Sequence, residues 1–284
     1  MAKQKQKQKA SSATQLSESG AIKTKSSDGA FPKTLLRDNG NHQGLVLEDL
    51  IANAVFVAQN ALSTKECDEW IKYAESAGTW DIVAHPATKW IAHRECSRLQ
   101  KNDWTMAHRL FTRIQQIVVE ASKKLDIFDK SSLINSSYAN NKNSPYANNK
   151  NKSYEYQPIT CNPNLRLYKY TKGQWFGKHI DDTNKIEWKG HDTPYPAADV
   201  AETQTEITVL FYLSSCRGGA TRFHLPKSSK KKGNKGVDDS VAFSPTQGAV
   251  LLHVHGDRCL EHEAEPVLDG VKYVLRTDIV YGIL

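Results

Sequence analysis

The chain has 284 residues, with 38 Lys and Arg against 31 Asp and Glu and a formal net charge of +7. This length is ample for a hydrophobic core, and an apolar fraction of 39% excludes wholesale disorder. No apolar run reaches the roughly 18 residues that span a bilayer, and the start of the chain lacks the apolar part of a secretory signal. The five cysteines are scattered without a C-x-x-C pair. We therefore expect a cytoplasmic or nuclear protein with reduced thiols and no membrane partner.

Residues 1–44 form a basic segment with eight Lys or Arg and three acidic residues, which accounts for +5 of the net charge. The segment is rich in Ser, Gln and Gly and has no apolar periodicity, which predicts a disordered tail before a folded domain over 45–284. Low-complexity loops are expected at 134–153, where the string YANNKN occurs twice, and at 226–240, where five lysines fall within 227–235. The basic tail and the lysines of 227–235 lack the interleaved aromatics of a base-stacking surface, so nucleic acid is not expected as a partner.

The first part of the domain is predicted to be a helical layer over 45–130. Ser63 and Glu66 have the spacing of a capping box, and apolar residues then recur at helical spacing until Gly78. Asp103 is placed to cap a second helix with a long apolar face. The aromatic residues of this part are interpreted as core.

After residue 160 the pattern changes to short apolar runs separated by Gly, Pro and Asp, which is typical of strands. Four such runs stand out: Leu165–Tyr170, Thr205–Leu213, Ala249–Val254 and Val271–Tyr281. Helices followed by strands predict an α+β domain whose sheet part, over 160–284, could close as a sandwich or barrel. The long connection at 182–204 contains aromatic and proline residues and is a candidate lid or substrate lip.

A His-x-Asp motif occurs at His179 and Asp181. Residues two apart on a strand share a face, so an imidazole and a carboxylate can point at one metal ion. A second copy occurs at His255 and Asp257. The motif alone does not choose between the two copies.

The residues that follow favour the first copy. His262 precedes a Pro/Gly turn and a strand that would place Lys272 and Arg276 on one face. Buried basic residues need an anion, and a carboxylate-bearing co-substrate is a natural partner. Two histidines and one carboxylate are the facial triad of non-haem iron(II), which leaves three coordination positions open. The second copy has no comparable histidine and basic strand after it, so His255 is not expected to be a ligand.

The stretch from Leu165 to Tyr281, about two-fifths of the chain, resembles the prolyl 4-hydroxylase-like branch of the iron(II)/2-oxoglutarate dioxygenases. Four motifs carry the resemblance, in the order in which the family has them: LRLYKYTKGQWFGKHID at 165–181, TVLFYL with GGATRF at 208–223, SPTQGAVLLH at 244–253, and HEAEPVLDGVKYVLRTD at 262–278. The resemblance implies a double-stranded β-helix, or jelly-roll, with a helical layer packed outside it.

The resemblance also implies a set of ligands and cofactors. His179, Asp181 and His262 would hold iron(II), and 2-oxoglutarate and dioxygen would be the co-substrates, with ascorbate as reductant. The implied reaction hydroxylates a C–H bond of a protein side chain or of a small molecule, and a prolyl residue is the first candidate substrate. Succinate and carbon dioxide are the implied co-products.

Two basic residues compete for the distal carboxylate of 2-oxoglutarate. Lys272 follows His262 by ten residues, as the family pattern has it, and is preferred. Arg276 lies four residues further on the same face and could take this role instead. Tyr170, on the strand that leads to His179, is a candidate hydrogen-bond donor to the same carboxylate, and a core role for it is equally open.

Two other functions stay open at this point. The first is a catalytically inactive jelly-roll that docks on a partner through its Lys-rich tail and loop. The second is a zinc-dependent jelly-roll enzyme, because zinc also accepts two histidines and a carboxylate. A basic strand after His262 argues against the zinc enzyme, since a hydrolytic site needs no dicarboxylate anchor. The oligomeric state is not predicted.

Overall fold

The computed structural model describes residues 30–37, 44–77, 79–128, 155–190, 194–196, 200–226 and 239–284. Its helices are η1 Lys33–Leu35, α1 Thr64–Ser76, α2 Trp104–Lys124 and η3 Gly256–Arg258. Its strands are β1 Glu48–Ile51, β2 Val55–Ala58, β3 Asp81–His85, β4 Arg94–Asn102, β5 Tyr156–Cys161, β6 Asn164–Tyr170, β7 Phe176–His179, β8 Ala201–Tyr212, β9 Arg217–Gly218, β10 Thr221–His224, β11 Ser240–Phe243, β12 Val250–Val254, β13 His262–Ala264, β14 Val267–Asp269 and β15 Lys272–Ile283.

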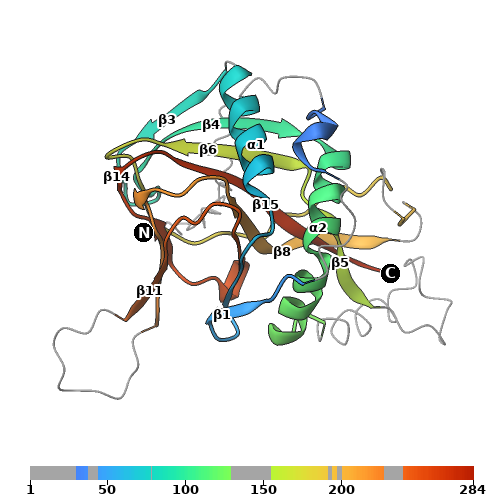
Figure 1. The fold of residues 1–284 in the computed structure, drawn as a ribbon. Helices are drawn as coiled ribbons and strands as arrows, with labels where there is room; N and C mark the ends of the chain where they lie inside the picture. The colour runs from blue at the N-terminus through green and yellow to red at the C-terminus, as the bar shows by residue number, and fades with distance from the viewer. Residues whose placement is uncertain are drawn as a thin grey trace, which may run out of the picture.

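Eight antiparallel strands form two sets that the chain visits in turn. The first set is hydrogen-bonded in the order β6-β15-β8-β12, and the second in the order β7-β13-β10-β11. β4 joins the two sets because it pairs with β6 and with β7. The chain runs from β6 to β7 and back to β8, and later from β12 to β13 and back to β15, as in a double-stranded β-helix. The predicted α+β class with a jelly-roll core is thus confirmed (Figure 1).

The predicted helical layer over 45–130 is only partly helical. Both expected helices are present, but β1, β2, β3 and β4 lie in the same range. β2 extends the first set beyond β12, and β4 extends it beyond β6. The strand β4 has the sequence RECSRLQKN and a mostly half-exposed burial pattern, so it lacks the apolar alternation by which a strand is recognised.

The predicted boundary near residue 45 is too far along the chain. Residues 30–37 belong to the folded body, where Phe31, Leu35 and Leu36 are buried in the main core. The Phe31 N–H donates to the Asp103 carboxylate at 2.6 Å, which ties this segment to the start of α2. Residues 1–29, the loop at 134–153 and the lysines of 227–235 lie outside the described residues.

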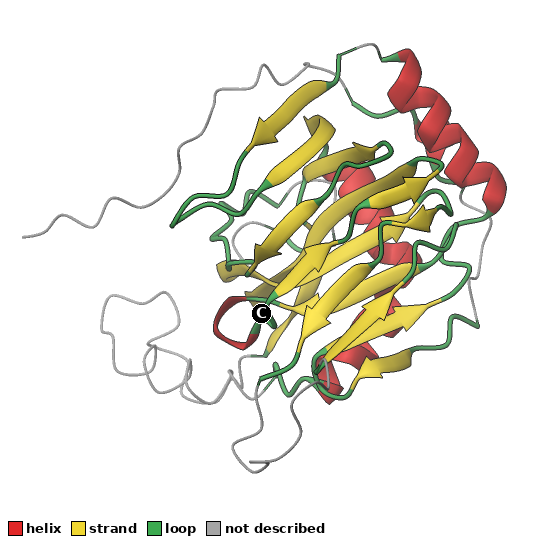
Figure 2. Cartoon of the chain, turned by 90° about the vertical axis from the view of Figure 1, so that its left-hand side faces the viewer, coloured by secondary structure: helices red, strands yellow, loops and turns green. Residues whose placement is uncertain are grey.

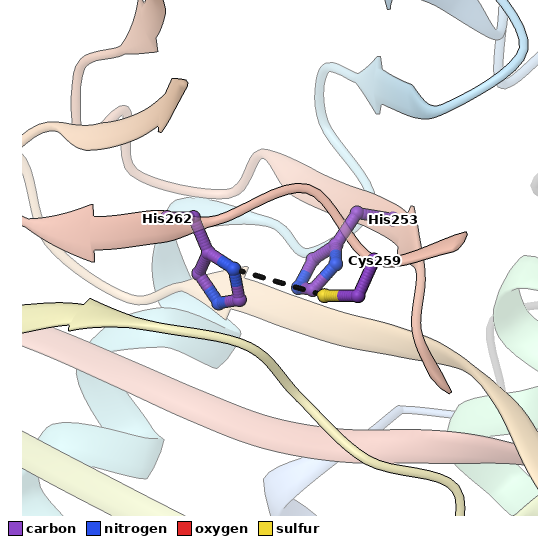
Figure 3. Close-up of side chains that lie close together, drawn as sticks. All are labelled: His253, Cys259 and His262. Carbon is purple, nitrogen blue, oxygen red and sulfur yellow. Dashed lines mark hydrogen bonds between the residues drawn. The ribbon is translucent and has the colours of Figure 1, made fainter. Parts of the chain in front are cut away.

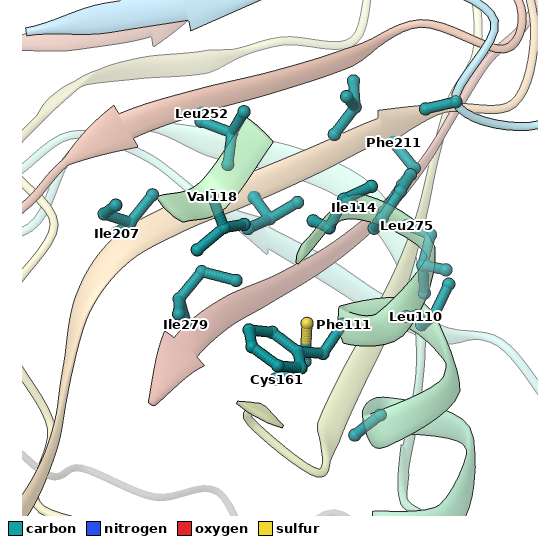
Figure 4. Packing of buried hydrophobic residues seen from close by; sticks show 14 of the residues in the cluster. Leu110, Phe111, Ile114, Val118, Cys161, Ile207, Phe211, Leu252, Leu275 and Ile279 are labelled. Carbon is teal, nitrogen blue, oxygen red and sulfur yellow. The ribbon is translucent and has the colours of Figure 1, made fainter. Parts of the chain in front are cut away.

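Both long helices cover one face of the first strand set (Figure 2). The Ser63 and Glu66 side chains form the predicted capping box of α1, and the Asp103 side chain caps α2 by accepting from the Met106 N–H. Residues of α2 such as Ile114 pack against side chains of β8, β12 and β15 (Figure 4). Of the helices in the described ranges, none has the length and apolar character to cross a membrane.

β15 separates the core from the interior of the barrel. Leu275 and Ile279 lie in the core beneath the helices, whereas Lys272, Val274 and Arg276 line a cavity on the opposite face. This division follows from the alternation of side chains along a strand. The period of two therefore places two basic side chains inside the jelly-roll.

A buried ion pair holds the amino-terminal segment, α1 and α2 together. The Arg113 guanidinium of α2 donates to the Glu66 carboxylate of α1 at 2.9 Å, and both side chains are at most 5% exposed. Glu66 also accepts from the backbone N–H groups of Ser63 and Arg37. Burial alone would raise the pKa of Glu66, but these hydrogen bonds, Arg113 foremost, lower it to about 2.

Replacing Arg113 by Met is expected to destabilise the fold by about 3–5 kcal/mol, because a buried carboxylate then loses its partner. Urea denaturation at pH 7 measures this loss. The contribution of Glu66 is present above its ordinary pKa near 4.5 and should fade as the pH falls toward 2. The matched control is Arg37→Met, which removes a half-exposed pair with Glu69 and should cost less than about 1 kcal/mol. Equal losses in the two variants would contradict this account.

Candidate metal centre

The structure brings His179, Asp181 and His262 together at one wall of the cavity. His179 ends β7, Asp181 follows two residues later, and His262 begins β13 directly opposite His179 in the antiparallel pairing. One donor atom from each residue lies within 4.8 Å of the other two. Asp181 Oδ1 is 3.8 Å from His179 Nε2, and its Oδ2 is 3.6 Å from His262 Nε2.

Backbone carbonyls orient both imidazoles. His179 Nδ1 lies 2.8 Å from the Gly177 oxygen, and His262 Nδ1 lies 2.9 Å from the Leu260 oxygen. A carbonyl can only accept, so each Nδ1 carries a proton and each Nε2 is the nitrogen left to bind a metal. This is the arrangement in which backbone groups fix the tautomer of a metal-binding histidine.

The Asp181 carboxylate is held in its ionised form. Arg276 Nη2 lies 2.9 Å from Oδ1, and the Thr208 hydroxyl donates to Oδ2 at 3.0 Å. Burial by itself would raise the pKa of Asp181, but Arg276 and His262 lower it well below its usual range. Burial also lowers the pKa of His179, to about 3, so that this imidazole stays neutral. Two imidazoles and one carboxylate fit the facial triad of an iron(II) site. His179 is already neutral, and His262 becomes neutral when a metal ion displaces its second proton.

His262 carries a second proton, on Nε2, while no metal is bound. Burial alone would lower the pKa of His262, but the adjacent Asp181 carboxylate raises it to about 9. A metal ion therefore has to displace about one proton at pH 7, and its affinity should rise with pH up to about 9. Calorimetric titration with manganese(II) in buffers of different ionisation enthalpy measures the released proton. An affinity independent of pH between 6 and 8 would contradict this picture.

Lys272 lines the same cavity and is 3% exposed. Its ammonium donates to the Gly219 carbonyl at 2.7 Å and lies over the rings of Tyr170 and Tyr212. Burial lowers the pKa of Lys272 to about 8. A side chain at Gly219 would come within 3.3 Å of Lys272 Cδ, so the glycine leaves room for this extended side chain.

The two candidate anchors for an anion differ in their partners. Arg276 pairs with Asp181 at 2.9 Å and lies 3.6 Å from Asp278. Lys272 has no carboxylate within 4 Å among the described residues. Tyr170 lies opposite Lys272 on β6, lines the same cavity and is 5% exposed, and burial raises its pKa so that the hydroxyl remains a donor.

The second His-x-Asp motif does not form a site in the structure. Asp257 is exposed in η3, whereas His255 is buried and its Nδ1 lies 3.0 Å from the Thr208 hydroxyl.

The segment 182–204, which was expected to form a lid or substrate lip, does not contribute its described residues to the cavity. Trp188 and Tyr195 pack on a separate cluster with Ile186, and none of the described residues of 182–204 lines the cavity.

His253 is a site residue that the sequence patterns did not indicate. It lies on β12, is 1% exposed, and its Nε2 is 3.5 Å from Asp181 Oδ2. Burial lowers its pKa well below the usual range, so it is neutral. The string LLHVH reads as an apolar strand, and only its pairing with β8 reveals that position 253 faces the interior.

No family model and no curated protein sequence matches the chain. Several solved structures are similar to it. A viral collagen prolyl hydroxylase from Paramecium Bursaria Chlorella virus-1, solved with 2OG, has 15% identity and a TM-score of 0.40, over 80% of this chain and 96% of that one. A Pseudomonas putida prolyl-4-hydroxylase has 13% identity and a TM-score of 0.45, over 81% and 94%.

A third similar structure is a prolyl hydroxylase from Trichoplax adhaerens in complex with a hypoxia inducible factor peptide fragment. It has 15% identity and a TM-score of 0.43, over 80% of this chain and 83% of that one. At 13% to 15% identity these likenesses say nothing of the substrate. The function has to be inferred from the side chains in the cavity.

Proposed function

We propose that this protein is an iron(II)- and 2-oxoglutarate-dependent dioxygenase that hydroxylates a C–H bond. The observation that carries the proposal is the buried Lys272 ammonium, which lines the same cavity as His179, Asp181 and His262 and has no carboxylate partner among the described residues. A buried charge is costly without a counter-ion, and a dicarboxylate that also chelates the metal would supply one.

The proposed roles follow from the contacts. His179, Asp181 and His262 would bind iron(II) and leave three positions open. Bound iron would supply the activation of dioxygen, coupled to decarboxylation of 2-oxoglutarate to succinate and carbon dioxide. Lys272 would bind the distal carboxylate, with the Tyr170 hydroxyl as a second donor.

The remaining cavity residues would position and protect the reacting groups. Arg276 holds the carboxylate of Asp181 in place and keeps it ionised. Phe176, Leu210 and Val274 add apolar surface to the cavity lining, which would exclude water from the reacting C–H bond. The substrate would be a protein side chain or a small molecule, and the sequence resemblance makes a prolyl residue the first candidate.

The proposal is tested with the purified full chain, iron(II), ascorbate and 2-oxoglutarate. We expect slow succinate formation that needs both iron and 2-oxoglutarate even without a prime substrate. Absence of both succinate and 2-oxoglutarate binding in iron-loaded protein would contradict it. Mass spectrometry of proteins and metabolites from deletion and parent cells would then search for the loss of a single added oxygen atom.

A further inference from the structure

A second group of metal-ligating side chains lies beside the first. His253 on β12, Cys259 after η3 and His262 on β13 place one donor atom each within 4.8 Å of one another. The Cys259 thiol lies close to both imidazoles (Figure 3). Cys259 Sγ is 3.9 Å from His262 Nδ1, compared with roughly 3.5 Å between sulfur and nitrogen ligands of one tetrahedral zinc ion. A cation bound here would replace the proton that Nδ1 donates to the Leu260 carbonyl.

His253 is an imidazole that the proposed iron site does not use. It is 1% exposed, and its Nε2 has no hydrogen-bond partner. Its Nδ1 lies 3.2 Å from the Val254 carbonyl, which can only accept, so Nε2 presents a lone pair. This lone pair faces Asp181 Oδ2 at 3.5 Å. Two facing lone pairs repel each other, and a cation bound between them would relieve the repulsion.

Cys259 affects which metal ions this group of ligands would prefer. Its sulfur accepts a hydrogen bond from the Asp181 N–H at 3.3 Å, and the residue is half-buried. Thiolate and imidazole ligands favour thiophilic or borderline cations such as zinc, whereas two histidines and a carboxylate with open positions suit iron(II). The two donor groups therefore differ in metal preference, although they share His262.

We propose that His253, Cys259 and His262 form a second binding site for a thiophilic divalent cation, of which zinc is the physiological example. This cation would bind Nδ1 of His262 and leave the remaining proton of the ring on Nε2, where iron(II) would bind, so the two cations would exclude each other. Binding would convert the Cys259 thiol to a thiolate, and the thiol proton and the proton of His262 Nδ1 would be released to solvent. The site does not depend on the proposed oxygenase activity, since its ligands are present whatever reaction the cavity performs.

Cobalt(II) is the probe, because cobalt bound to a thiolate absorbs in the near ultraviolet by charge transfer and cobalt bound to nitrogen and oxygen alone does not. The metal-free full chain is titrated with cobalt(II) and its absorption recorded. We expect a charge-transfer band that saturates with one cobalt per chain. Cys259→Ser should abolish the band, while Cys216→Ser should retain it, because Cys216 is also half-buried but lies outside this group.

Two further variants separate this site from the iron site. His179→Ala removes a ligand that only the iron site uses, so its cobalt–thiolate band should persist. His253→Gln should raise the cobalt concentration that half-saturates the thiolate band by more than about tenfold, as loss of a direct ligand outweighs loss of an outer contact. Cobalt binding without the band in the wild type, or a band that survives Cys259→Ser, would overturn the proposal.

A band lost in His179→Ala would also overturn it, since Cys259 would then only complete the iron site. The band is recorded without 2-oxoglutarate or turnover. A wild-type protein that shows the Cys259-dependent band but forms no succinate would contradict the oxygenase function alone. Circular dichroism of each variant confirms that the chain is folded before its spectrum is compared.

Discussion

Asp181→Ala protein is expected to lose iron-dependent succinate formation by more than 100-fold. Removing a residue that only contacts a metal ligand already lowers metal affinity or activity by about 10- to 100-fold, and Asp181 is a proposed ligand itself. Among the described residues, Asp181 is the one carboxylate within 4 Å of the Nε2 atoms of both proposed histidine ligands, at 3.8 Å and 3.6 Å. Without it, two imidazoles would hold iron(II) weakly. Chromatographic assay of succinate over a range of iron concentrations measures the effect.

The chain carries its own matched control for this substitution. Asp257 occupies the same position in the second His-x-Asp motif but is exposed, so Asp257→Ala should turn over like the wild type. Asp181→Ala leaves the Arg276 guanidinium without its nearest partner and could unfold locally. His179→Ala avoids this problem, since that side chain is less buried, and it should lose activity equally. Wild-type succinate formation in both Asp181→Ala and His179→Ala would rule out this metal centre.

The part of the site that could be predicted depends on short-range geometry. His179 and Asp181 are two residues apart, and Lys272 and Arg276 are four apart on one strand, so the period of two brings each pair to one face. The meeting of His179 with His262 depends instead on the register between β7 and β13, two strands that lie far apart in the chain. Local patterns do not specify that register, and only the family order of motifs indicated it.

The missed features have the same physical origin. His253 faces the proposed metal ligands because it pairs with Thr208 across β12 and β8, and neither residue stands out in its own strand. Phe31 and Leu36 lie in a segment whose composition resembles a disordered tail, yet both are buried in the main core, where the Phe31 ring packs on aromatic rings of α1. The four strands predicted from apolar runs were predictable because tertiary context reinforced their local pattern, as it did for both capped helices.

The second large effect is expected on the binding of 2-oxoglutarate, for whose distal carboxylate Lys272 and Arg276 are the two candidate anchors. Lys272→Met is expected to weaken binding of 2-oxoglutarate by about 2–5 kcal/mol, or roughly 30- to 4,000-fold, because it removes the buried partner of a carboxylate. Arg276→Met should instead raise the iron concentration needed for activity, since Arg276 contacts Asp181 at 2.9 Å. Its Michaelis constant for 2-oxoglutarate should stay within a few-fold of the wild type at saturating iron. The opposite pattern in the two variants would assign the anchor to Arg276.

The pH dependence provides an independent signature of Lys272. Burial lowers its pKa to about 8 in the unliganded protein, and only the charged ammonium can pair with a carboxylate. Affinity for 2-oxoglutarate should therefore be constant below pH 8 and fall about tenfold per unit above it, as deprotonation competes with binding. Lys272→Arg keeps the charge at every accessible pH, so this variant should bind 2-oxoglutarate without the alkaline loss. A wild-type affinity that is constant up to pH 10 would mean that the anchor is a guanidinium, and Arg276 is then the remaining candidate on this face of β15.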